Sequence, residues 1–74
     1  MTDTADKILR LYQQTNIRAD ESLLYVAVIN MIRVEQSEIH NAVAELKELG
    51  YLQESDERLF LTKKGFEYIC SELK

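Results

Sequence analysis

The stretch from Gln36 to Phe66 constrains the fold more than any other part of the chain. Its first half repeats apolar residues three or four positions apart, which predicts a helix with one buried stripe. A serine before the stripe is expected to cap this helix, and Gly50 is expected to end it in the left-handed conformation. The cap is Ser37, and the stripe consists of Ile39, Ala42, Val43, Leu46 and Leu49.

The second half of this stretch predicts a β-hairpin followed by another helix. Tyr51-Leu52 and Arg58-Leu59-Phe60-Leu61 have the composition of short strands, and they flank the polar turn Glu54-Ser55-Asp56-Glu57. Thr62 is expected to cap the next helix, with Gly65 in its first turn. The predicted order is therefore helix, glycine, strand, turn, strand, helix.

This order resembles the winged-helix domains of small bacterial, archaeal and phage regulators. Three segments carry the resemblance and cover about half of the chain: Val-Glu-Gln-Ser-Glu-Ile at 34–39, Ala-Glu-Leu-Lys-Glu-Leu-Gly-Tyr-Leu at 44–52 and Leu-Thr-Lys-Lys-Gly at 61–65. The resemblance implies an α+β fold, a winged helix-turn-helix with a three-helix core, a β-hairpin wing and a C-terminal helix. It further implies a single domain over residues 1–74, in which residues 36–49 form the recognition helix.

The segments before residue 36 predict two more helices. Thr2, Asp3 or Thr4 is expected to cap the first helix, whose apolar face is formed by Ala5, Ile8, Leu9 and Tyr12. The polar residues 13–16 are expected to end it, and residues 17–19 fit either a short strand or a loop. A second helix is expected between Asp20 and Arg33, with Asp20 or Ser22 as its cap.

Residues 23–29 are apolar at seven consecutive positions, so periodicity alone allows either a helix or a buried strand. The resemblance favours the helix. Such a helix is apolar on almost every side, which leaves two explanations. Either neighbouring helices cover it on both sides, or its uncovered side meets another chain. The second explanation predicts a homodimer or a protein partner.

The last helix is expected to pack through Phe66, Ile69, Cys70 and Leu73, which recur at helical spacing. Cys70 is the chain's one cysteine, which excludes an internal disulfide and a zinc site built on paired cysteines. Its place on the stripe predicts a small buried hydrophobic residue rather than a reactive thiol.

The resemblance implies DNA binding, in transcriptional control, as the leading function. Polar side chains near the start of the recognition helix are the ones expected to reach base edges of double-stranded DNA. Basic side chains on that helix, on the wing and after it are expected to contact phosphates. The predicted base contacts are Gln36, Ser37, His40 and Asn41. The predicted phosphate contacts are Lys47, Arg58, Lys63 and Lys64, with Arg33, just before the recognition helix, as a further candidate.

The charge of the chain argues for an alternative. Thirteen acidic and nine basic residues give a formal net charge of −4, whereas DNA-binding surfaces are normally basic. Carboxylates lie on the recognition helix, at positions 38, 45 and 48, and in the wing, at 54, 56 and 57. The alternative is therefore a winged-helix protein-interaction module, such as a phage or mobile-element factor that binds a host protein, without DNA binding.

Other functions find little support in the sequence. One histidine, one cysteine and no glycine-rich loop supply no catalytic set, so we expect neither an enzyme nor a cofactor. Glu35, Glu38 and His40 do not have the spacing of metal ligands. The longest apolar run, residues 23–29, is too short to span a bilayer, and no leader pattern opens the chain, so a cytoplasmic location is expected.

Overall fold

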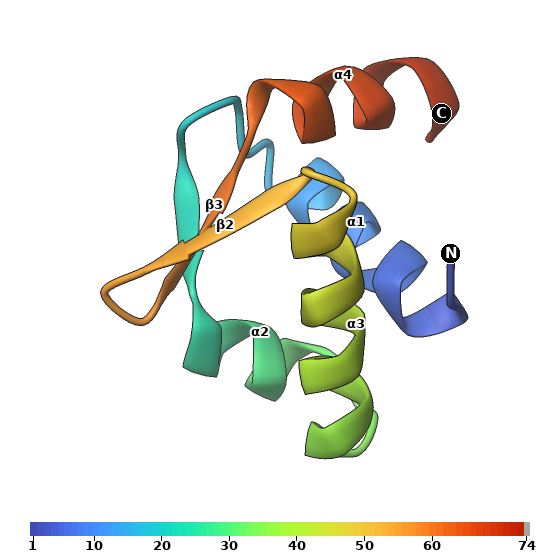
Figure 1. Cartoon of the computed structure of the whole chain (residues 1–74), viewed down its shortest axis with the longest axis vertical. Coiled ribbons are helices and arrows are strands. Elements are labelled where there is room, and N and C mark those ends of the chain that lie inside the picture. The colour runs from blue at the N-terminus through green and yellow to red at the C-terminus, as the bar shows by residue number, and fades with distance from the viewer. Residues whose placement is uncertain (74) are drawn as a thin grey trace.

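The computed structural model describes residues 1–73, which form four helices and a three-stranded antiparallel sheet (Figure 1). This confirms the predicted α+β class. Within these residues, no helix has both the length and the apolar character needed to cross a bilayer. In chain order the elements are α1 (Asp3–Gln14), β1 (Ser22–Leu24), α2 (Tyr25–Met31), α3 (Gln36–Glu48), β2 (Leu52–Ser55), β3 (Arg58–Leu61) and α4 (Lys63–Glu72).

The predicted hairpin is present, with β3 in the middle of the sheet between β1 and β2. β2 extends to Ser55, so the turn is shorter than the predicted 54–57 and consists of Asp56 and Glu57. Both turn residues have positive φ, 50° and 63°. A two-residue turn of this kind matches the right-handed twist of its strands, which explains why the hairpin closes so tightly.

The first strand lies at Ser22–Leu24, inside the segment where a helix was predicted, and residues 17–19 form a loop. Leu23 pairs with Leu59 of β3, and the Tyr25 N–H extends the pairing by donating to the Glu57 carbonyl at 2.8 Å. The predicted caps Asp20 and Ser22 are wrong, because α2 starts only at Tyr25, with no side-chain cap. Pairing with a distant strand thus divides the apolar run between a strand and a helix.

The sequence predicts the C-terminal end of α3 correctly but not the cap at its N-terminal end. The prediction that Ser37 caps the helix is wrong: the N-cap is Glu35, which makes no side-chain cap, and Ser37 lies in the first turn. Gly50, with φ of 80°, ends the helix as predicted. Its N–H donates to the Lys47 carbonyl at 3.1 Å, and the Tyr51 N–H donates to the Leu46 carbonyl at 2.9 Å. These two bonds form a Schellman motif.

One hydrophobic core joins the helices to the inner face of the sheet. The predicted inward faces of α1 and of α3 up to Leu46 are buried, as expected. Leu49, the C-cap residue that follows α3, is 37% exposed, contrary to prediction. Cys70 is also exposed, contrary to prediction, because Ile69 of α4 and Leu73 after it are the side chains that turn inward.

Tyr12 ties α1 to the middle strand from inside the core. Its side chain is fully buried, and its hydroxyl donates a hydrogen bond to the Leu59 carbonyl at 2.7 Å. Burial raises the pKa of this hydroxyl, and the nearby Leu23 amide offsets part of that rise. The hydroxyl therefore keeps its proton, and its donor role, throughout the neutral pH range.

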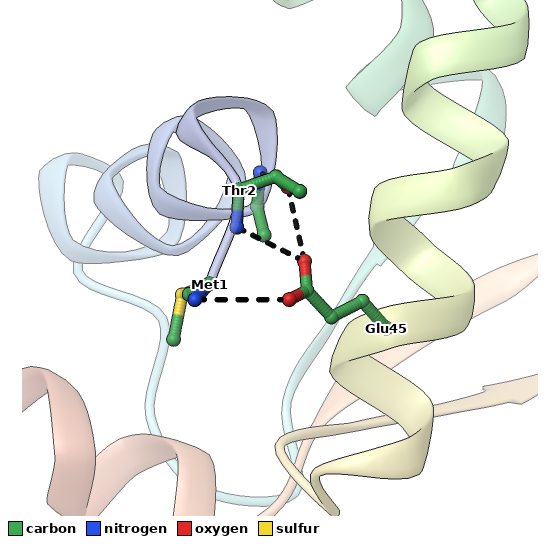
Figure 2. Close-up of polar contacts among 4 residues, drawn as sticks. Met1, Thr2 and Glu45 are labelled. Carbon is green, nitrogen blue, oxygen red and sulfur yellow. Dashed lines mark hydrogen bonds and ion pairs between the residues drawn. The ribbon is translucent and has the colours of Figure 1, made fainter.

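The start of α1 is fixed to α3 by Glu45 (Figure 2). Thr2 caps α1 by accepting from the Ala5 N–H at 3.2 Å, and its hydroxyl and N–H both donate to Glu45 Oε1, at 3.0 and 3.2 Å. The Met1 amine lies 3.8 Å from Glu45 Oε2. The hydrogen bonds from the Thr2 amide and hydroxyl lower the pKa of the Glu45 carboxyl. Glu45 is thus engaged within the chain.

Thr62 caps α4, as the sequence predicts. Its hydroxyl oxygen accepts from the Gly65 N–H at 3.0 Å, and the hydroxyl donates toward the Gly50 carbonyl at 2.6 Å. The same threonine donates its N–H to the Tyr51 carbonyl at 3.1 Å. One residue therefore joins the start of α4 to the segment that ends α3.

Candidate functional site

A groove of about 550 Å³ lies between α2, α3 and the β2–β3 hairpin. In Figure 1 the hairpin projects to the left, α2 lies below it and α3 runs along the right. Val43 of α3 is almost completely buried beneath the groove, whereas Leu24 and Val26 are 43% and 57% exposed. Large apolar side chains that are this exposed mark a surface that a binding partner can cover with a gain in free energy. The apolar lining residues are Leu24, Val26, Ile29, Val43 and Ala44.

Two polar pairs cross the groove. The Tyr25 hydroxyl lies 2.6 Å from His40 Nδ1, which joins α2 to α3. Lys47 Nζ lies 3.0 Å from Glu54 Oε1, which joins α3 to the hairpin. Both pairs are exposed to water, so each contributes about 1 kcal/mol or less to stability. Burial, and then the nearby Glu54 carboxylate, raise the pKa of the Tyr25 hydroxyl.

The elements around this groove carry the negative charge of the chain. α3 has three carboxylates and one lysine, and the hairpin from Leu52 to Leu61 has three carboxylates and one arginine. Each element therefore has a net charge of −2, and the two together equal the formal net charge of −4. The rest of the chain is balanced, so the net acidity of the composition lies on α3 and the hairpin. Of these carboxylates Glu54 and Glu57 line the groove, whereas Glu38 and Glu45 line a separate pocket beside Thr2.

The predicted base-contact residues do lie together. Gln36, Ser37, His40 and Asn41 are all exposed on the first half of α3. His40 is engaged with Tyr25, as described above, whereas the other three make no side-chain hydrogen bond to any residue within 1–73. The structure thus keeps three polar side chains of this group free on one helix face.

The predicted phosphate contacts are dispersed. Lys47 is paired with Glu54, and Arg58 Nε donates to the Ser22 hydroxyl at 2.7 Å, on the β1 side of the sheet. Lys63 and Lys64 begin α4, and Lys64 Nζ lies 5.6 Å from the Tyr51 ring centroid. Tyr51 follows the C-terminal end of α3, a helix of 13 residues and roughly 18 Å. These lysines are therefore at the opposite end of α3 from its base-contact residues.

A basic cluster lies elsewhere on the surface, and from the sequence only its Arg33 is a candidate phosphate contact. Lys7 and Arg10 of α1 come together with Arg33, after α2, around the exposed side chain of Met31. Arg10 Nε also pairs with Asp6 Oδ2 at 2.7 Å. The spacing of residues 7 and 10 places them on one helix face, but their meeting with Arg33 depends on tertiary packing. This cluster shares no lining residue with the groove.

A scan against protein-family models, a search of curated proteins and a search of solved structures each gave no match to this chain. Among residues 1–73, no three histidine, cysteine, aspartate or glutamate side chains come together as metal ligands would. The function has therefore to be inferred from the groove, its charges and the exposed face of α3.

Proposed function

We propose that this chain is a winged-helix domain that binds another protein through the groove between α2, α3 and the hairpin. The element order and the antiparallel sheet, with β1 beside the hairpin, support the winged-helix assignment. In this assignment α3 is the recognition helix and the β2–β3 hairpin is the wing. A winged helix that binds DNA contacts it through the recognition helix and the wing. This domain would use the same face to bind a protein.

The apolar groove with carboxylates beside it is the observation that carries this proposal. Proteins hold DNA by neutralising its phosphates with lysine and arginine, and each carboxylate facing the backbone opposes that. Here the helix and hairpin that would face the duplex are both acidic. Of their two basic groups, Lys47 is paired with the Glu54 carboxylate, and Arg58 donates a hydrogen bond to the neutral Ser22 hydroxyl. Covering Leu24 and Val26 with a protein partner instead contributes roughly 25 cal/mol for each Å² of apolar area removed from water.

DNA binding in transcriptional control is the second candidate, and one observation favours it. Gln36, Ser37 and Asn41 are exposed and free on the first half of α3, where a recognition helix presents the side chains that contact base edges. A homodimer, predicted from the apolar second helix, would bring two such helices together. The partial exposure of α2 agrees with that prediction, since Val26 and Met31 are 57% and 54% exposed.

A fluorescence anisotropy titration with a labelled mixed-sequence duplex at low salt separates the two candidates. We expect no saturable binding by the natural chain. The Glu54→Lys, Glu57→Lys double variant is expected to gain salt-sensitive binding, because it reverses the charge of the hairpin.

The opposite result would establish DNA binding. It consists of tight binding by the natural chain that weakens steeply with salt, a changed base preference in Asn41→Ala, and a uniform loss in Lys64→Ala. Because Asn41 and Lys64 are both exposed, neither variant is expected to disturb the fold.

A further inference from the structure

We infer that the occupant of the α2–α3–hairpin groove is a basic amphipathic helix of another protein, seated by its apolar face. This inference rests on the proposed protein-binding function and adds the chemistry of the partner. It follows from the shape of the groove, from the charges beside it and from the mismatch that a second copy of this chain would create.

The shape of the groove suits the apolar face of a helix. Its apolar walls are side chains of β1, α2 and α3, with Leu24 of β1 and Val26 of α2 on one side and the small side chain of Ala44 on the other. A partner gains most by presenting several apolar side chains from one face, which a helix does at spacings of three, four and seven residues. The volume of about 550 Å³ accommodates more than one such side chain.

The charges beside the groove select a basic partner. Glu54 and Glu57 line the hairpin side, and Asp56 lies next to Glu57 at the exposed tip. Lys47 balances Glu54 alone, and Arg58 is turned to Ser22. The remaining carboxylates would attract lysine or arginine on the polar face of an approaching helix, and such complementarity raises the association rate and selects the partner.

A second copy of this chain fits the groove less well. In a symmetric dimer the same surface of both copies meets, so the acidic hairpins would face each other. A second copy could instead place its basic cluster in the groove, which would pair the groove carboxylates with Lys7, Arg10 and Arg33. That contact is head-to-tail, however, and tends to build rings or filaments rather than a closed pair.

Two synthetic peptides of equal length test the inference against the ¹⁵N-labelled chain by NMR. Both carry leucines at helical spacing, and their other positions are mainly lysine in one and glutamate in the other. We expect the lysine peptide to shift the amides of Val26, Ala44 and Glu57, with an affinity that falls as salt is added. The glutamate peptide, and a lysine peptide whose leucines are replaced by serine, are expected to leave these amides unchanged.

Two variants of α2 provide a matched control. Val26→Asp adds a charge inside the groove and is expected to weaken binding of the lysine peptide at least ten-fold. Met31→Asp adds the same charge at a side chain of similar exposure that does not line the groove, and it is expected to bind as the natural chain does. Both side chains are more than half exposed, so neither substitution removes core packing.

Each of the remaining outcomes would refute one part of the proposal. Equal binding of the acidic peptide, no binding of the basic one, or shifts away from these amides would refute the basic helix while leaving protein binding in place. A dimer in light scattering that dissociates in Val26→Asp would replace the helix by a second copy. Saturable duplex binding at the same amides would refute the protein-binding function itself.

Discussion

The Gly65→Ala variant is expected to lose roughly 3 kcal/mol or more of its free energy of unfolding. A Cβ at position 65 would overlap the carbonyl oxygen of Tyr51 and would lie 2.9 Å from Cδ1 of the buried Leu61. The main obstacle is backbone, which cannot rotate away as a side chain can. That carbonyl also accepts the Thr62 N–H, so moving it disturbs the joint between the sheet and α4.

Urea denaturation followed by circular dichroism measures this loss, and Gly50→Ala is the matched control. At Gly50 an added Cβ meets Lys64 Cδ at 3.6 Å, an ordinary contact, so its cost comes from the backbone φ of 80°. That cost is roughly 1–2 kcal/mol. If the two alanine variants prove equally stable, the close approach of α4 to Tyr51 is wrong.

The Leu46→Ala variant is expected to lose roughly 2–5 kcal/mol, the second large effect. Leu46 is completely buried in the middle of the core, where α3 packs on α1 and on the sheet, and the shortened side chain leaves a cavity. A 74-residue domain has roughly 4–11 kcal/mol of stability in all. This single substitution therefore removes a large part of it.

The Leu49→Ala variant is the matched control for Leu46→Ala. Both leucines belong to the apolar stripe predicted from the sequence, but Leu49 is 37% exposed. Its replacement is expected to cost less than about 1 kcal/mol. The urea midpoint should fall with an unchanged slope in Leu46→Ala and move little in Leu49→Ala. Equal shifts would contradict the difference in burial between Leu46 and Leu49.

The parts of the fold that the sequence predicts correctly are those encoded by neighbouring residues. The stripe up to Leu46, the helix end at Gly50, the β3 strand and the cap at Thr62 all depend on signals within one or two turns of chain. From the sequence, Gly65 is marked only as a member of the Leu-Thr-Lys-Lys-Gly segment at 61–65, without a physical reason for the glycine. The structure adds the physical reason, which is the close approach of α4 to the Tyr51 carbonyl.

The predictions fail where contacts between distant segments of the chain determine the structure. The strand at Ser22–Leu24 forms because β3 is available to pair with it, and no local pattern distinguishes it from the start of a helix. Cys70 faces water because α4 is covered on one side only. The same limit applies to the candidate site: the exposed polar face of α3 follows from periodicity, whereas the groove combines residues from 24 to 57.

The sign of the electrostatic potential at the groove tests the central claim most directly, because it requires no partner. Paramagnetic co-solutes of similar size but opposite charge, added to the ¹⁵N-labelled chain, report that potential at each amide. The acidic groove predicts that the cationic co-solute relaxes the amides of Ala44, Glu54 and Glu57 more strongly than the anionic one. Stronger relaxation by the anionic co-solute at these amides would contradict the account and favour DNA.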